Sequence, residues 1–505
     1  MGSNRDSGVV FPEVGRTVDG ETPMGPRWAW LAVLLLGVAT LWVVTDPVSA
    51  GAVGNAPGVS AEGLKVGFSR VDITPDPVRE KVWMAGFGRG RQAQKVHDKL
   101  WVRACVLEHG GKKLAFACPD LIGLFDEQVR GAEERLRAKG FETIISVTHN
   151  HHGPDTLGLW GPGLSTGVDH KYWKRVEDAV VLAVEQAGEK TTPVKASIGT
   201  VNAGDLVKDS RQPYVKMEDL TVLRFDGLQS DEKLPTGLFV LWHNHPEFIN
   251  SKTTEITSDF VGEVIELLAK KYQCPVFYAT GAIGGLMAPI PLEVKAGESP
   301  DGMAHRSGSF EALRVYSQRI ADRASRAVER TEPVTLTPWK LNQRDVYLPV
   351  DNMIYRAGHQ LGALKRKMHR WGGDISKPGD ESNKDAKPAV RTRAGVLTLG
   401  EVQVALVPGE IYPELVLGKV PDPAPEGADF PEALVEPALL GQLKAKHKLV
   451  IGLAQDEIGY IIPRRIWDAK APWSYGRKDA PYGEINSLGP ETAGWLLPVY
   501  GELAK

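Results

Sequence analysis

Two apolar segments that each end in the pattern His-x-His constrain this chain more than any other feature. They occupy 144–155 and 237–246, and a proline closes the apolar run in both. Five of the twelve histidines lie in them: His149, His151, His152, His243 and His245. If each segment is a buried strand, alternate side chains share a face and the paired histidines point the same way. One such motif fits solvated histidines at a strand exit equally well, but two of them favour a metal site.

The composition is that of an ordinary globular protein, with 42% apolar and 24% charged residues among 505. The net charge is −3 and no basic stripe occurs, so nucleic acid is not expected as a partner. Three cysteines are too few for a disulfide or metal framework. Cys105 and Cys118 flank a turn at 109–112, where they either pair across a hairpin or, as we favour, stay reduced in the core.

The N-terminus carries a targeting pattern. Residues 1–27 are polar and predicted to be disordered, whereas 28–44 contain no charge and small residues precede a cleavage site after Ala50. We interpret 28–50 as a signal peptide or a membrane anchor, followed by a linker at 51–63. The body is therefore expected outside the cytoplasm, either secreted or periplasmic, or membrane-associated through the apolar segment.

The body, 64–505, is predicted to be one large α/β domain with mixed β-sheets flanked by helices. Helical periodicity and end signals predict four helices, at 126–139, 172–187, 260–272 and 310–330. Apolar runs closed by turn residues predict strands at 64–75, 101–107, 113–118, 194–200, 220–225, 276–279, 400–407 and 450–453. The charged segment 366–392 has almost no apolar periodicity and is predicted to be a flexible insertion.

These signals together resemble the catalytic domain of the neutral ceramidases. The segment 148–154, Thr-His-Asn-His-His-Gly-Pro, is similar to that family's Thr-His-Thr-His-Ser-Gly-Pro. A later Pro-Gly-Glu at 408–410 and tyrosines near the end follow in the family's order, and the resemblance runs from about Val66 onward. It implies a zinc-dependent amidase that splits the N-acyl bond of ceramide, or of a related small amphipathic amide, into an amine and a fatty acid.

The resemblance also implies a set of site residues. The family's zinc is held by two histidines, a glutamate and a tyrosine, which fall on His149, His243, Glu410 and Tyr460. The residues implied to act on the substrate are His151, Arg211 and Tyr482. His151 would shuttle a proton or support the oxyanion, and Arg211 and Tyr482 would donate hydrogen bonds to it. Bound Zn²⁺ would lower the pKa of its water from about 15.7 to about 7.

Several positions depart from the family pattern. His152 replaces the serine after His-x-His, His245 is an additional histidine, and 283–285 lack the acidic residue of the family's Ala-Gly-Asp loop. The family's C-terminal β-sandwich domain is not expected, because the sequence ends soon after 489–490. Two alternatives remain: another metallohydrolase of the two-metal amidohydrolase type, and a non-catalytic exported binding protein on the same fold. The apolar loop 157–164 is either a substrate wall or a plain Gly-Pro loop.

Overall fold

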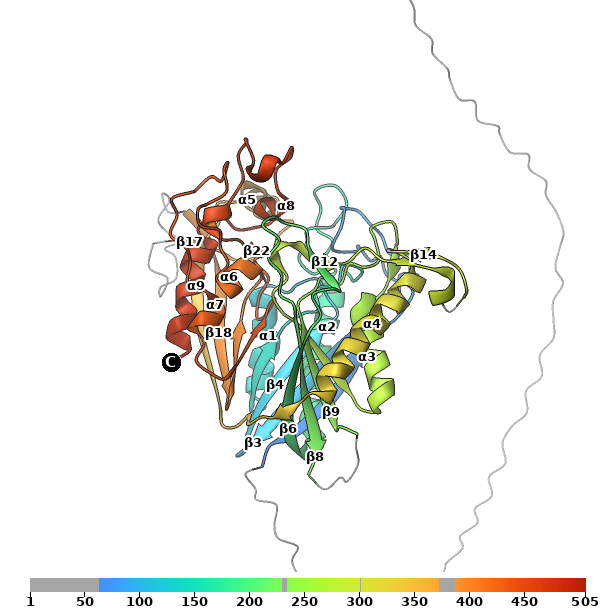
Figure 1. Cartoon of the computed structure of the whole chain (residues 1–505). Helices are drawn as coiled ribbons and strands as arrows, with labels where there is room; N and C mark the ends of the chain where they lie inside the picture. The colour runs from blue at the N-terminus through green and yellow to red at the C-terminus, as the bar shows by residue number, and fades with distance from the viewer. Residues whose placement is uncertain (1–62, 229–233, 300, 372–386) are drawn as a thin grey trace, which may run out of the picture. The chain divides into compact units, whose positions relative to one another are not determined.

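The structure is a computed structural model that describes residues 63–228, 234–299, 301–371 and 387–505. Two mixed sheets form its centre (Figure 1). The larger sheet has the order β11-β9-β8-β6-β1-β3-β4-β5, with β15 paired to β6. Its strands are β1 (Lys65–Asp72), β3 (Trp101–His109), β4 (Lys112–Pro119), β5 (Phe141–Ile145), β6 (Thr192–Asn202), β8 (Asp219–Gly227), β9 (Gly237–Trp242), β11 (Val276–Thr280) and β15 (Glu332–Pro333).

The smaller sheet has the order β16-β18-β19-β21, with β17 paired to β18. Its strands are β16 (Trp339–Pro349), β17 (Met368–Trp371), β18 (Lys387–Leu399), β19 (Val402–Leu406) and β21 (His447–Ile451). Short strand pairs complete the described β-structure: β2 (Lys95–Val96) with β10 (Glu255–Ile256), β7 (Val207–Asp209) with β12 (Met287–Pro289), β13 (Glu293–Val294) with β14 (His305–Arg306), and β20 (Glu410–Ile411) with β22 (Tyr460–Ile461).

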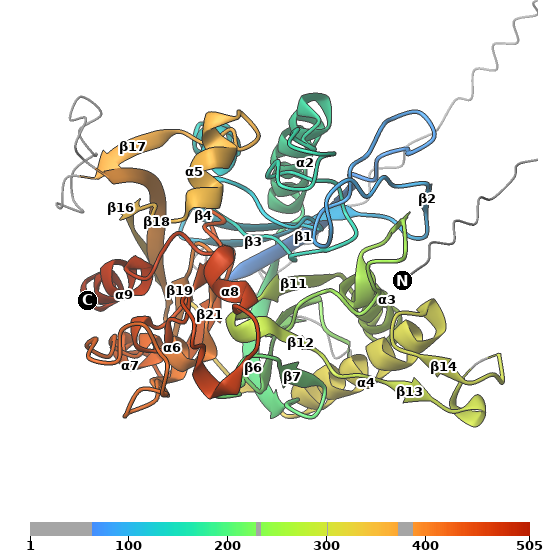
Figure 2. The same ribbon diagram turned by 90° about the horizontal axis from the view of Figure 1, so that it is seen from above.

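Several α-helices of the described residues pack on the outer faces of the sheets. They are α1 (Asp126–Arg137), α2 (His170–Glu189), α3 (Asp259–Tyr272), α4 (Phe310–Glu329), α5 (Met353–Gln360), α6 (Pro413–Leu417), α7 (Leu439–Gln442), α8 (Tyr482–Ile485) and α9 (Thr492–Leu503). Helices α1 and α2 pack on the β1-β3-β4-β5 half of the larger sheet, and α3 and α4 pack on its other half. Helix α9 packs on β16 and β18 of the smaller sheet (Figure 2).

The two halves of the larger sheet join only at the first residues of β1 and β6, through two residue pairs. They then face each other, so that Phe116 of β4 lies 5.3 Å from Phe239 of β9 between ring centroids. The smaller sheet adds Leu397, Val404 and other apolar side chains to the same core. Three β-layers therefore enclose one apolar core, and each layer has its own helical cover.

Main-chain hydrogen bonds join the C-terminal ends of five strands. Gly281 N–H donates to the carbonyl of Trp242 (2.8 Å), which ties the ends of β11 and β9. Gly452, just after β21, donates its N–H to the carbonyl of Thr280, the last residue of β11 (3.0 Å). A further N–H of the same loop donates to the carbonyl of Val407, just past β19. Gln455 N–H donates to Ile145 (2.7 Å), the last residue of β5. The loops that carry the sequence-predicted site residues consequently leave the core at one edge.

The predicted fold class is confirmed, and so are all four predicted helices, to within one or two residues at each end. One local prediction was wrong: β5 ends at Ile145 and β9 at Trp242, so the histidine motifs lie in loops beyond the strands. Both ends of the predicted insertion form paired strands, β17 and β18, while 372–386 lie outside the described residues.

The three cysteines all lie in described segments, and they are buried and unpaired. Cys105 faces Phe116 in the hairpin register and Cys118 faces Arg103, so the two thiols are not directly opposite each other. Residues 1–62, including the predicted signal or anchor at 28–50, lie outside the described residues. Among the helices that are described, none has the length and hydropathy of a membrane span.

A buried ionic network links α1 to the smaller sheet. The carboxylate of Asp126, which is fully buried, pairs with Arg391 (2.8 Å) and Arg393 (3.1 Å) of β18 and with Arg130 (2.8 Å). Arg393 also pairs with Glu133 at 2.8 Å. A buried charge that loses its partner retains its desolvation cost, so every member of such a network depends on the others.

We predict that Asp126→Asn lowers the free energy of unfolding by about 3–5 kcal/mol, because the partly buried Arg391 loses its counter-charge and the buried Arg393 loses one of its two. Urea denaturation followed by circular dichroism measures the change. The matched control is Asp178→Asn, which removes a half-exposed carboxylate 2.7 Å from Arg135 and should cost about 1 kcal/mol or less. Equal effects of the two substitutions would contradict a structural role for the network.

Candidate metal centre

His149 is held in an uncommon backbone conformation. Its φ is +67°, in the left-handed region that non-glycine residues seldom adopt. Its Nδ1 lies 2.7 Å from the carbonyl oxygen of Ile122, and because a carbonyl can only accept, Nδ1 carries the proton. Nε2 is therefore the nitrogen with a lone pair. Burial lowers the pKa of His149 to about 4, so the ring is neutral at pH 7, as metal binding requires.

His245 is fixed in the same way. Its Nδ1 donates to the carbonyl of Met287 at 2.8 Å, and its Nε2 lies 2.8 Å from Oε2 of Glu410. The same carboxylate oxygen is 3.5 Å from Nε2 of His149. Burial alone would lower the pKa of His245, but the adjacent Glu410 carboxylate outweighs it and raises this pKa. Carbonyl oxygens behind both rings are the partners that orient metal-binding histidines in proteins.

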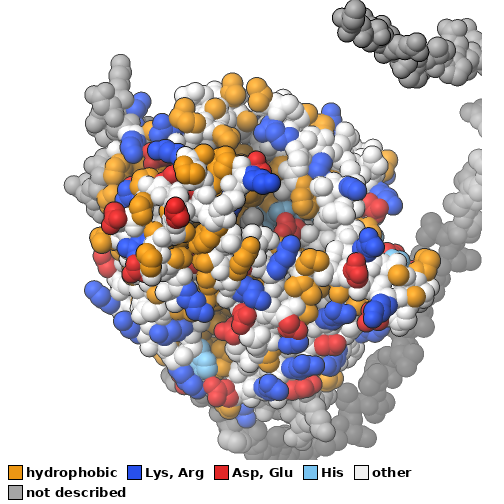
Figure 3. Space-filling view, turned by 45° about the horizontal axis from the view of Figure 1, so that its top comes forward, with side chains coloured by type: hydrophobic (Ala, Val, Ile, Leu, Met, Phe, Trp, Pro, Cys, Tyr) orange, Lys and Arg blue, Asp and Glu red, His pale blue; other side chains and the backbone are white. Residues whose placement is uncertain are grey.

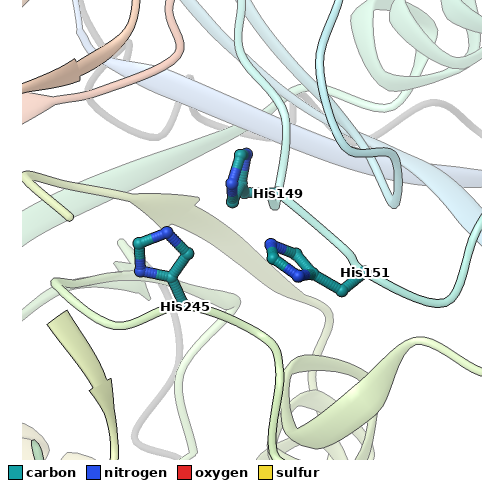
Figure 4. Close-up of side chains that lie close together, drawn as sticks. All are labelled: His149, His151 and His245. Carbon is teal, nitrogen blue, oxygen red and sulfur yellow. The ribbon is translucent and has the colours of Figure 1, made fainter. Parts of the chain in front are cut away.

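Three histidine rings converge at this point (Figure 4). The ring centroids of His149 lie 5.0 Å from those of both His151 and His245, and those of His151 and His245 are 5.7 Å apart. One ring nitrogen from each histidine lies within 4.8 Å of the other two. In a second group, one nitrogen of His149 and one carboxylate oxygen each of Glu410 and Glu457 also lie within 4.8 Å of one another. All five residues are buried, so their donor atoms face one small space.

His151 has no hydrogen-bond partner on either ring nitrogen among the described residues, although both nitrogens are buried. Its nearest carboxylate is Glu247, at 3.7 Å from Nδ1. Burial and the neighbouring histidines lower its pKa well below the ordinary value. Gly86 makes room for the ring, since a Cβ at that position would lie 2.5 Å from the His151 side chain, and its φ of +97° also favours glycine. The glycine-rich loop 84–90 is thus part of the site's wall.

Glu410 and Tyr460 are brought together by a short parallel strand pair, β20 with β22, in which they are directly opposite each other. The Tyr460 hydroxyl is close enough to the Glu410 carboxylate to contribute to lowering the pKa of that carboxyl group, after the larger effects of His149 and His245. Both side chains are buried, and both line the same pocket as His149 and His151. A ligand set of imidazoles, carboxylate and phenol suits a divalent transition-metal ion.

The structure does not bring His243 into the cluster. Its Nδ1 accepts a hydrogen bond from Ala282 N–H at 2.9 Å, and its ring packs against Gly281. The member of the second motif that joins His149 is His245, two residues later. Both were visible in the sequence, but the choice depends on the chain path after β9, which ends at Trp242. Sequence analysis also gave no role to Glu457; the acidic pair at 456–457 in an otherwise apolar segment was the available signal.

Arg211 does not line the pocket. Its guanidinium makes two 2.7 Å hydrogen bonds to Glu484 of α8 and one of 3.1 Å to the carbonyl of Ile466. Both members of this ion pair are buried. Tyr482, at the start of the same helix, does line the pocket and is half exposed. Burial raises the pKa of Tyr482 to about 12, so its hydroxyl stays protonated.

The pocket beside the cluster has about 840 Å³ of empty space, part of it open to solvent. The surface seen in Figure 3 is hollowed, with hydrophobic side chains around the hollow. Apolar side chains from three separate parts of the chain line it: Phe125, Leu157, Leu159, Trp160, Leu364 and Met368. The donor atoms of His149, His151, Glu410 and Glu457 lie against this apolar wall. The first half of the loop 157–164, residues 157–160, accordingly forms part of the pocket wall.

Comparison with solved structures identifies the fold. The chain superposes on a crystal structure of neutral ceramidase from Pseudomonas aeruginosa with a TM-score of 0.63 and 16% sequence identity, over 88% of this chain and 74% of that one. A second ceramidase structure, complexed with C2, gives a TM-score of 0.61 at 15% identity, over 88% and 75%. The resemblance inferred from sequence is thus confirmed for the fold. No protein-family model and no curated protein matches the sequence.

We predict that, in the absence of substrate, Arg211→Met lowers the free energy of unfolding by about 3–5 kcal/mol, because it leaves the Glu484 carboxylate buried and unpaired. Thermal and urea unfolding of the purified protein measure this loss. Arg137→Met, which removes an exposed arginine, should change stability by about 0.5 kcal/mol at most. If Arg211→Met had the same free energy of unfolding as wild type, the ion pair would not be structural. Arg211 would then be free to contact the substrate, as the sequence resemblance implied.

Proposed function

We propose that the chain is a zinc-dependent amidase that hydrolyses the N-acyl amide bond of ceramide or a related lipid amide to an amine and a fatty acid. The observation that carries this proposal is a buried cluster of histidines and carboxylates at the wall of an apolar pocket. A pocket of this kind fits a substrate with one long apolar arm and one polar reacting group. The shared fold with a neutral ceramidase supports the same reaction class.

His149, His245, Glu410 and Tyr460 would hold the ion, with His245 in place of the sequence-predicted His243. When bound, zinc would lower the pKa of a coordinated water and polarise the scissile carbonyl. The carbonyl oxygens of Ile122 and Met287 would keep both histidines in the ligating tautomer.

Two further residues would act on the substrate. His151 is neutral and has two nitrogens without partners, so it can accept a proton at one nitrogen and release one to the leaving amine. Tyr482 stays protonated and can donate to the oxygen of the reacting carbonyl. Arg211 would act indirectly, because its bonds to Glu484 hold the helix α8 that carries Tyr482.

The acyl chain would lie along the apolar wall formed by the loop 157–160 and by residues 364 and 368. Burial of a chain there contributes about 0.8 kcal/mol per methylene group. We also propose that the domain works outside the cytoplasm, directed by the segment 28–50. N-terminal sequencing of the exported protein would distinguish cleavage after Ala50 from a retained anchor.

The assignment of the second histidine gives a sharp prediction. His245→Asn should lose bound zinc and the release of fatty acid from a short-chain fluorescent ceramide, because it removes a ligand. His243→Asn should keep both, because the asparagine oxygen can accept the Ala282 N–H in place of Nδ1. Zinc is measured by mass spectrometry of the purified proteins, beside the turnover assay.

The opposite pattern, with zinc lost only in His243→Asn, would reject the proposed ligand set. Zinc binding without release of fatty acid from any acyl amide would reject the amidase and favour a binding protein. If His151 transfers the proton, the zinc-loaded His151→Ala variant should be slower than wild type by about 10²–10⁴-fold. Undiminished turnover in that variant would exclude His151 from proton transfer.

The acyl pocket gives a second prediction. Leu159→Trp should narrow the pocket and raise KM for long-chain amides by about 10-fold or more relative to acetyl amides, since excluding two methylenes removes over 1 kcal/mol. Leu164→Trp is the matched control, because Leu164 lies in the same loop but is 73% exposed and does not line the pocket. Equal chain-length profiles in the two variants would place the acyl chain elsewhere.

A further inference from the structure

Glu457 is a buried carboxyl group that the proposed reaction leaves without a role. Its side chain is 6% exposed, and Oε1 accepts a 2.7 Å hydrogen bond from Gly459 N–H. Oε2 is buried and has no hydrogen-bond partner among the described residues. One oxygen is therefore fixed by the backbone of the loop, and the other has unused lone pairs.

The position of this carboxyl group points to the metal centre. One of its oxygens lies within 4.8 Å of donor atoms of both His149 and Glu410. Gly123 leaves room for the side chain, because a Cβ at 123 would lie 2.8 Å from Cγ of Glu457. The site is therefore shaped to hold a second carboxylate beside Glu410.

Glu410 has His245 as a partner at 2.8 Å, but no cationic side chain bonds the carboxyl group of Glu457 among the described residues. The buried Arg366 lies beside the loop, but its guanidinium bonds the carboxylate of Asp456 and the main-chain carbonyls of Glu457 (3.2 Å) and Arg391 (2.7 Å). Two adjacent buried carboxyl groups repel each other strongly in a medium of low dielectric constant when both are ionised. A divalent cation between them would remove that repulsion and use the vacant lone pairs of Oε2.

We propose that Glu457 is a further ligand of the bound ion, so that this centre contains two carboxylates. The proposal rests on the metal centre assigned above. Five protein donors with one open position approach the six-coordinate, oxygen-rich arrangement that Mn²⁺ prefers, whereas zinc usually takes four ligands. Glu457 would thus raise the affinity for Mn²⁺ and Co²⁺ more than the affinity for Zn²⁺.

Metal affinity tests this inference without any substrate. Zn²⁺ and Mn²⁺ would be titrated against a chelator into metal-free wild type, Glu457→Gln and Glu247→Gln. Glu247 is the matched control, because its carboxylate lies 3.7 Å from His151 but its oxygens belong to neither group of close donor atoms. Glu457→Gln should weaken Mn²⁺ binding by more than about 100-fold. This exceeds the roughly 10–100-fold loss expected when a residue that only hydrogen-bonds a metal ligand is replaced. Zn²⁺ binding should weaken by less.

The visible spectrum of the Co²⁺-loaded proteins gives an independent measurement. Absorption strengthens as the coordination number of Co²⁺ falls, so Glu457→Gln should absorb more strongly than wild type and Glu247→Gln should not. Glu457→Asp keeps the charge on a shorter side chain, so its absorption should lie between those of wild type and Glu457→Gln. This variant also controls for misfolding of the glutamine variant.

Equal affinities and equal spectra for Glu457→Gln and Glu247→Gln would overturn the inference, even in an active amidase. Conversely, a protein that hydrolyses no amide but shows the expected Mn²⁺ loss in Glu457→Gln would reject the proposed function and keep the ligand. A wild type that binds none of the three ions would reject both.

Discussion

The loop 452–461 is the part of the structure on which the remaining site depends. Its backbone bonds the ends of β5, β11 and β19, so it joins both sheets where their strands stop. Three of its residues have positive φ, which lets so short a segment reverse direction repeatedly: Leu453, Gln455 and Gly459. The Gln455 side chain adds bonds to the main chain of β5 on both sides of Ile144. Because these bonds all go to the main chain of the strands or their ends, the sheets set the path of the loop.

Buried charges hold the same loop from the side. The Asp456 carboxylate accepts from Asp126 N–H at the start of α1 (2.9 Å) and pairs with Arg366. Asp126 in turn pairs with the arginines of β18, so a helix, a sheet and the loop share one set of charges. Each charge has lost its hydration, and the arrangement is stable only while all partners are in place. The site is accordingly supported by a network that reaches the pocket directly, since Arg366 lines it and Asp126 and Asp456 are next in sequence to the lining residues Phe125 and Glu457.

The sequence predicted what depends on local pattern and missed what depends on distant pairing. The motif around His149 and the Pro-Gly-Glu before Ile411 were recognisable because each follows a strongly apolar strand. Strands β16 and β18 were not expected, because polar and charged side chains interrupt their apolar pattern. Arg211 was taken for a substrate contact, since its partner Glu484 is 273 residues away and only the fold brings them together. The same limit applies to His243 and His245, which differ only in the path of the loop after β9.

The residues of the metal centre are spread over most of the chain, and His245 and Glu410 alone are separated by 165 residues. Contacts of such long range form late, because the chain must first close large loops. A growing or partly folded chain therefore has the first histidine motif long before it has the carboxylates that complete the site. Occupancy of the centre by an ion would report that both sheets have assembled, and the acquisition of metal would follow folding instead of guiding its first steps.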